Sequence, residues 1–184
     1  MGTTLAKWTL QDYHRMIDVG LLDDRRVELL NGEIVEMAPE GEPHAYFSHE
    51  SAEYLKILLG DRVTIRQGKP ITIPASNSEP EPDLAIVQPL GREYLQHHPF
   101  PENIFWLIEF AHSSLAQDTD LKRKIYAAAN IPEYWVVALK TPQLRVFRDP
   151  SHGDYHSEVT LTSGEICPVA FPEVTISVQR LLEG

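Results

Sequence analysis

Residues 78–87, with the sequence SEPEPDLAIV, place a proline and an acidic residue directly before a short apolar run. The run from Leu84 to Val87 is typical of a β-strand buried on both faces. Asp83 lies at the entrance to this strand, where an unpaired carboxylate is costly to bury. Three kinds of partner can compensate Asp83: a bound metal ion, a contact in a cap or turn, or solvent at the open end of the strand.

A second apolar run, IFWLIEF at residues 104–110, carries a carboxylate near its end. This run is nearly continuous in apolar residues, as expected of a central strand. Glu109 lies 26 residues after Asp83. A glutamate in such a strand needs a partner, either a metal ion or a salt bridge to Lys122 or Arg123. If the two strands are neighbours, both carboxylates converge at one edge of the sheet and create a site for Mg²⁺ or Mn²⁺.

The segment SLAQDTDLKRKIYAAANI, at residues 114–131, has the spacing of a helix. Its apolar residues recur on one stripe, and Pro132 prevents continuation. Lys122 lies four residues after Asp118, so the two can form a surface ion pair worth about 0.2–0.5 kcal/mol. Next to two convergent carboxylates, the same lysine can instead orient an attacking water and offset charge on a phosphate.

The rest of the chain predicts a mixed sheet with helices on its faces. Asn31-Gly32 lies between two strand-like runs in RRVELLNGEIVEM, and a type I′ hairpin turn prefers this dipeptide. A second strand pair is expected in RVTIRQGKPITI, residues 62–73, on either side of Gly68. We also expect a helix beginning at Thr9, a helix from His44 to Leu59, a buried strand at residues 133–139, short C-terminal strands with turns at Asp149-Pro150 and Ser163-Gly164, and an apolar turn at residues 178–182.

Length and composition limit the possible functions. At 184 residues, with 42% hydrophobic residues, the chain is long enough for one core, and we expect a single domain spanning residues 1–184. The formal net charge of -11 opposes nonspecific capture of nucleic acid by the whole surface, but not by a local basic strip. One cysteine, no visible secretory signal and no membrane-spanning run indicate a cytoplasmic protein. The sequence has no glycine-rich phosphate loop and no Gly-x-Ser-x-Gly elbow, so P-loop and serine esterase chemistry are unsupported.

Three motifs resemble those of a large, mostly uncharacterised bacterial family whose members are assigned as endonucleases. This family is especially expanded in cyanobacteria. They are EPDLAIV at residues 81–87, WLIEFAHSSLAQDTDLK at 106–122 and YAAANIPEYWVV at 126–137. The family belongs to the PD-(D/E)XK restriction-endonuclease-like superfamily. The resemblance takes in the hairpin and the helix at His44 as well, and so covers about residues 8–139. It implies an α/β fold, a restriction-endonuclease-like three-layer α/β/α domain with a mixed central sheet and an added N-terminal hairpin.

The resemblance also implies roles for individual residues. In that superfamily the Pro-Asp aspartate and the acid of the (D/E)XK motif bind magnesium, and the motif's lysine assists the attacking water. Asp83 and Glu109 match the two acids, with help from the Phe110 carbonyl, and a divalent cation would then compensate Asp83. Ala111 stands where the motif's lysine belongs, and Lys122 on the following helix is the matching position in this family.

Four further residues bear on the site. Glu28 matches a glutamate habitual in the family and can be an outer metal ligand or a partner of the helix lysine; a cross-strand pair with an arginine such as Arg26 is equally compatible. His44 begins a helix that can face the same corner, although a lone histidine near a helix start is commonly a packed or capping residue. His112 is a second departure, because related sequences tend to have an aspartate there. Lys124 lies roughly 200° around the helix from that lysine and is expected to contact nucleic acid.

The sequence thus predicts a nuclease that depends on Mg²⁺ or Mn²⁺ and hydrolyses phosphodiester bonds of nucleic acid, with DNA as the expected substrate. A catalytically silent relative that binds nucleic acid or protein on the same fold is the alternative. A purely structural oligomer is a third possibility, suggested by exposed-looking aromatics such as Tyr134 and Trp135. We expect a homodimer with no membrane association, because symmetric dimers are the commonest assembly, and contacts at the C-terminal strands and around Tyr134.

Overall fold

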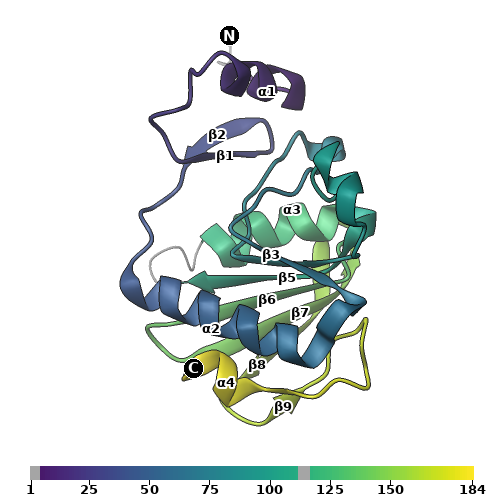
Figure 1. Cartoon of the computed structure of the whole chain (residues 1–184). Helices are drawn as coiled ribbons and strands as arrows, with labels where there is room; N and C mark the ends of the chain where they lie inside the picture. Colours follow the sequence, from purple (N-terminus) through teal and green to yellow (C-terminus); the bar gives the residue numbers. More distant parts are fainter. Residues whose placement is uncertain (1–4, 112–116) are drawn as a thin grey trace.

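The computed structural model describes residues 5–111 and 117–184, which form a sheet covered by helices together with an N-terminal helix and hairpin (Figure 1). The elements are α1 (Leu10–Asp18), β1 (Val27–Leu30), β2 (Glu33–Glu36), α2 (Glu42–Leu59), β3 (Thr64–Gln67), β4 (Leu84–Val87), β5 (Ile104–Ala111), the wide π-type turn η5 (Gln117–Lys122), α3 (Arg123–Ala128), β6 (Glu133–Ala138), β7 (Gln143–Ser151), β8 (Asp154–Leu161), β9 (Glu165–Ile166), β10 (Ile176–Ser177) and α4 (Val178–Leu182). Among the described residues, no helix is both long enough and apolar enough to span a bilayer.

The central sheet has six strands in the order β3-β4-β5-β6-β7-β8. Strands β5 and β6 are parallel, and every other neighbouring pair in this sheet is antiparallel. All residues of β4 and β6 are buried, as their continuous apolar runs predict for strands covered on both faces. The mixed sheet expected from the sequence is confirmed.

Helices cover both faces of this sheet, so the domain has three layers (Figure 1). On one face α2 and α4 pack against the strands through residues such as Leu55 and Leu181. On the other face α3 contributes Ile125 and Tyr126. Side chains alternate between these two cores along each strand, because successive strand residues point to opposite faces. The three-layer α/β/α arrangement predicted from the sequence is therefore confirmed.

The N-terminal hairpin forms its own two-stranded sheet, in which β1 and β2 are antiparallel. Asn31 and Gly32 connect them with positive φ values of 50° and 74°, as a type I′ turn requires. A Cβ atom on Gly32 would also lie 2.9 Å from the Trp8 carbonyl oxygen, so glycine is needed for both reasons. This hairpin is confirmed, and its register places Glu28 opposite Val35.

The prediction of a second strand pair at residues 62–73 is wrong for the second strand, on the far side of Gly68. Strand β3 pairs with β4, and residues 69–73 form no strand. Pro70 has no N–H group for a ladder. The next amides find distant partners instead: Ile71 donates to the Pro80 carbonyl and Thr72 to the Pro99 carbonyl, each at 3.0 Å. Contacts far away in sequence thus replace the local hairpin.

One of the two expected C-terminal turns needs correction. Asp149-Pro150 lies inside β7 and is no turn, since Pro150 pairs with Tyr155. The chain turns at His152 and Gly153, both with positive φ. The turn at Gly164 is present, with φ at 92°.

The aromatic residues Tyr134 and Trp135 are both fully buried, at 0% exposure. Each side chain packs into one of the two cores, because the strand that carries them is covered on both faces. They therefore cannot form the exposed patch that suggested a structural oligomer, or the dimer contact expected around Tyr134. Of the helix expected at residues 114–131, the described part comprises η5 and α3, and Asn130 follows with a positive φ of 57°.

Candidate active site

Asp83 and Glu109 lie in one corner at the end of the central sheet. Asp83 directly precedes β4, and Glu109 lies in β5, where Ile108 pairs with Leu84. Two hydrogen bonds hold them in place: the Asp83 amide donates to Glu109 Oε2 at 3.3 Å, and the Phe110 amide donates to Asp83 Oδ2 at 2.7 Å. Pairing between β4 and β5 therefore holds both carboxylates at one sheet edge, as expected for neighbouring strands.

Lys122 is the last residue of η5, and its side chain extends into this corner. Its Nζ lies 3.0 Å from Glu109 Oε1 and 3.2 Å from Glu28 Oε2. All three side chains are nearly inaccessible, with exposures of 5% for Lys122, 3% for Glu109 and 2% for Glu28. The salt bridge from Glu109 to Lys122, which the sequence left open, is thus present. Burying two carboxylates here is tolerable because an ammonium lies between them.

Glu28 enters the site from the hairpin. Its Oε2 atom accepts a hydrogen bond from the Glu81 amide at 3.1 Å in addition to contacting Lys122. Its neighbour across the hairpin is Val35, so no arginine faces it directly on β2. Of the alternatives open from the sequence, contact with Lys122 is the one that the geometry supports. A role as an outer metal ligand stays a prediction.

His44, in the first turn of α2, bridges two carboxylates. Its Nε2 lies 2.9 Å from Asp83 Oδ2 and its Nδ1 2.9 Å from Glu40 Oε1. The hydrogen bond to Asp83 raises the pKa of His44 to about 9, although burial opposes the shift. The imidazole is therefore charged near neutral pH, and its ring meets the edge of Phe110 at a centroid distance of 6.3 Å.

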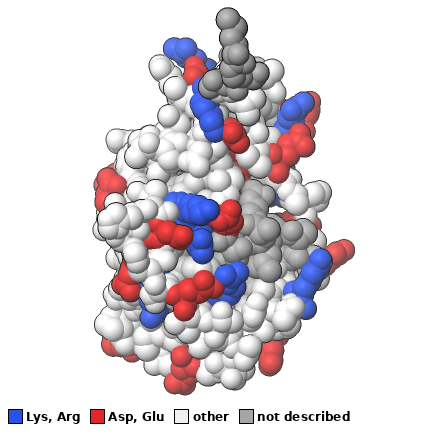
Figure 2. All heavy atoms as spheres, turned by 180° about the vertical axis from the view of Figure 1, so that it is seen from behind, with Lys and Arg blue, Asp and Glu red and all other residues white. Residues whose placement is uncertain are grey.

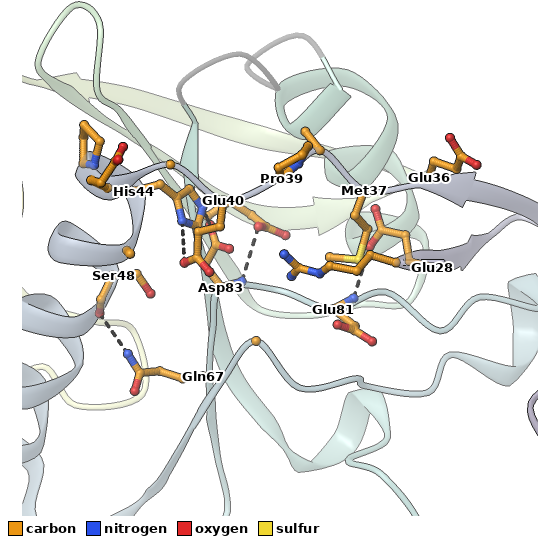
Figure 3. Close-up of a pocket in the computed structure, with 18 of the residues that line it drawn as sticks. Glu28, Glu36, Met37, Pro39, Glu40, His44, Ser48, Gln67, Glu81 and Asp83 are labelled. Carbon is orange, nitrogen blue, oxygen red and sulfur yellow. Dashed lines mark hydrogen bonds and ion pairs between the residues drawn. The ribbon is translucent and has the colours of Figure 1, made fainter. Parts of the chain in front are cut away.

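A pocket of about 800 Å³ opens onto this corner (Figure 3). Its lining comes from the end of the hairpin, the start of α2, the turn after β3 and the segment before β4. Glu81 also faces it, and burial, followed by the negative charge of Glu28, raises the pKa of Glu81 above its ordinary value. The candidate site is therefore a concave, strongly acidic pocket.

The donor atoms fit a small hard divalent cation. Asp83 and Glu109 supply carboxylate oxygens in one corner, and Mg²⁺ commonly uses one or two carboxylates and completes its shell with water. The Phe110 amide points to Asp83, and the N–H and C=O of one strand residue face the same edge, so the Phe110 carbonyl faces this side too. Among the described residues there is no cluster of three His, Cys, Asp or Glu side chains able to hold a metal.

Lys124 lies apart from this corner. Lys124 is exposed and pairs with Asp120 at 2.7 Å, so the two lysines of this segment do point in different directions. The Asp118 side chain and His112 lie outside the described part of the structure, and their roles stay predictions.

Two contacts were missed by sequence reasoning. The Tyr126 hydroxyl donates to Glu109 Oε1 at 3.2 Å, and Glu40 contacts His44. Both had a signal in the sequence. Tyr126 lies four residues after Lys122, and Glu40 four residues before His44, so each pair can share one side of a helical segment.

Comparisons with known proteins identify the family and the fold. The model of the Uma2 family, described as "Putative restriction endonuclease", matches residues 10–179. A crystal structure from Anabaena variabilis, titled as a putative nuclease belonging to DUF820, superposes with a TM-score of 0.72. The alignment has 13% sequence identity and covers 94% of this chain and 96% of that one, so it establishes a common fold. No curated protein matches the chain.

Proposed function

The chain belongs to the Uma2 family, described as "Putative restriction endonuclease", and we propose that it is a nuclease that hydrolyses phosphodiester bonds of nucleic acid with the aid of Mg²⁺ or Mn²⁺. One observation carries the proposal: Lys122, Glu109 and Asp83, which lie on three separate elements, meet at the floor of one pocket. Phosphoryl transfer uses a cationic group and carboxylates that hold a metal ion, next to a space that admits the phosphate.

Asp83, Glu109 and the Phe110 carbonyl would hold the ion. A divalent cation bound there would lower the pKa of a water molecule and offset charge on the phosphate. The two hydrogen bonds between β4 and β5 keep the ligand carboxylates in place before any ion arrives. This preorganisation supports the assignment because catalytic groups work best when their geometry is already fixed.

Lys122 would position the attacking water and stabilise the negative charge that develops on the phosphate. Ala111, where a strand lysine would stand, is a buried core residue. Lys122 arrives from η5 and reaches the same acid, Glu109, at 3.0 Å. The Tyr126 hydroxyl bonds the same Glu109 oxygen, and so orients that carboxylate.

The catalytically silent binding module remains a second candidate, favoured by a specific feature of the site. Both ligand carboxylates contact protein cations, Glu109 with Lys122 and Asp83 with His44. This arrangement balances charge without a metal ion, as a protein that has lost catalysis would need. A homodimer is also proposed, with the C-terminal edge strand β8 as its contact in place of the buried Tyr134.

The test is a cleavage assay on single- and double-stranded DNA and RNA with Mg²⁺ or Mn²⁺, repeated with EDTA. We expect cutting by the wild type and a loss of at least about 100-fold in Asp83→Asn, which keeps the side-chain shape. Asp61→Asn removes an exposed acid outside the pocket and should cut like the wild type. If no substrate is cut under any of these conditions, the nuclease proposal fails and the binding module takes its place.

A further inference from the structure

The chemical groups of the candidate site lie at the bottom of the pocket and not on its rim. Glu109 and Lys122 are 3% and 5% exposed, and the Asp83 side chain is 17% exposed. A phosphorus atom and its attacking oxygen must come within about 3–3.5 Å of each other to react. The scissile phosphate must therefore enter the pocket itself and cannot rest across its mouth.

Two chain segments border the way in. In Figure 3 the labelled residues of segment 36–44 follow one another along one side of the pocket, and Gln67, Glu81 and Asp83 lie along the other. The two sides meet where His44 contacts Asp83 at 2.9 Å. A strand that enters this space has to bend and present one phosphate between the two walls. A single strand bends readily, whereas duplex DNA is stiff over about 150 base pairs.

The charge of the walls acts in the same direction. Seven acidic residues line the pocket: Glu28, Glu36, Glu40, Glu42, Glu81, Asp83 and Glu109. The basic residues in the lining are Arg26, Lys122 and His44, so the acidic residues outnumber them. A duplex carries one negative charge per about 1.7 Å of its axis, twice the density of a single strand. The repulsion from these walls is therefore greater for a duplex.

The face visible in Figure 2 offers no broad basic surface as a substitute. Among the described residues on that face, Lys and Arg side chains are interspersed with Asp and Glu. Proteins that hold duplex DNA by its backbone typically present a continuous basic stripe.

From these observations we infer that the pocket takes single-stranded nucleic acid, including the single-stranded tail of a duplex, and excludes the interior of an intact duplex. The inference rests on the nuclease function proposed above and adds the class of substrate. The recessed position of the reacting groups between two chain segments selects flexibility, and the acidic walls select low charge density.

A binding experiment tests the inference independently of catalysis. Fluorescence anisotropy of the wild-type protein in Ca²⁺ would compare three DNA probes of one sequence: a single strand, its blunt duplex, and the duplex with a single-stranded tail. We expect the single strand and the tailed duplex to bind at least about tenfold more tightly than the blunt duplex. Equal or tighter binding of the blunt duplex, or no binding of any probe, would overturn the inference.

Cleavage of the same probes with Mn²⁺ is the second readout. Cuts confined to the single strand and the tail support the inference, and cuts inside the blunt duplex refute it. A protein that prefers single strands in the binding assay but cuts none of the probes would refute the nuclease function while leaving the strand preference intact. The two proposals can thus fail separately.

A pair of wall variants isolates the contribution of charge. Glu36 and Glu42 line the pocket, are exposed, and are not among the proposed catalytic residues. E36Q/E42Q should strengthen duplex binding more than single-strand binding and so narrow the preference by about threefold. The control E53Q/E165Q removes two exposed acids outside the pocket and should leave the preference unchanged. If both double variants change the preference for the single strand over the blunt duplex by the same factor, the charge of the pocket walls is not its cause.

Discussion

Replacing Lys122 with methionine keeps most of the side-chain volume and removes the ammonium between two buried carboxylates. Glu28 and Glu109 are 2% and 3% exposed and lie 3.2 and 3.0 Å from its Nζ. Removing one partner of a buried ion pair costs about 3–5 kcal/mol, because the remaining charge stays buried. The whole free energy of unfolding of a domain is about 5–15 kcal/mol. We therefore expect Lys122→Met to lose about a fifth or more of the free energy of unfolding, measured as a lower urea midpoint.

Two comparisons show whether the buried charges cause this loss. Lys124→Met removes an exposed lysine that pairs with Asp120 on the surface, and should cost no more than about 0.5 kcal/mol. E28Q/K122M removes one of the stranded carboxylates, and should regain part of the stability lost in K122M. If the free energy of unfolding of K122M is within about 0.5 kcal/mol of the wild-type value, the ammonium between the two buried carboxylates does not stabilise the fold.

The same variants separate folding from catalysis. E28Q/K122M, assayed where it is fully folded, should not cut nucleic acid, since the cation beside Glu109 is absent. K124M should still cut, with weaker binding of nucleic acid and a smaller dependence on salt. Wild-type cutting by folded E28Q/K122M would refute the role of Lys122.

Three further outcomes follow from individual contacts. Asp83→Asn should stay folded, because an amide oxygen can still accept from the Phe110 amide, and should lose Mn²⁺ affinity measured by calorimetry; unchanged affinity would exclude Asp83 as a ligand. Burial raises the pKa of Tyr13 from 10.0 to about 12, so above pH 10 the folded state keeps a proton that the unfolded state loses. By pH 11 the wild type should therefore lose about 1 kcal/mol of its free energy of unfolding, and Tyr13→Phe should not. Glu133 is fully buried and accepts from Trp135, Arg148 and the Val169 amide, so Glu133→Gln should lower the thermal midpoint by several degrees, for about 1–3 kcal/mol; an unchanged midpoint would show that these bonds contribute little.

The strands that form the site could be predicted because their signals are local. Continuous apolar runs identified β4, β5 and β6, and the Asn31-Gly32 dipeptide identified the hairpin turn. Residues 69–73 could not be predicted in this way, because the amides of Ile71 and Thr72 bond to the carbonyls of Pro80 and Pro99, which the local sequence pattern does not bring near. The aromatic pair at 134–135 was misjudged as exposed although its apolar run predicts a buried strand, and the two side chains pack into opposite cores.

The acids of the site were identifiable from sequence because a carboxylate stands out in an apolar strand. Their partners were harder to find. Glu109 was expected to have either a metal ion or a lysine, and the structure supplies Lys122 and Tyr126 together. The charged contact of His44 depends on where α2 begins relative to β4, and no spacing within either element encodes that distance.

The hairpin belongs to the site even though it lies outside the main sheet. Two strands alone are marginally stable in water, so β1 and β2 depend on contacts with the rest of the domain. One is the bond from the Glu79 amide to the Leu29 carbonyl, at 2.7 Å, and another is Glu28 with Lys122. A slip of one residue in the register of β1 would turn Glu28 to the opposite face and leave Val27 or Leu29 beside the ammonium. The turn at Asn31-Gly32 and the bridge to Glu79 both oppose that slip. The contact between Glu28 and Lys122 therefore both holds the hairpin against the domain and balances the charge of the ammonium.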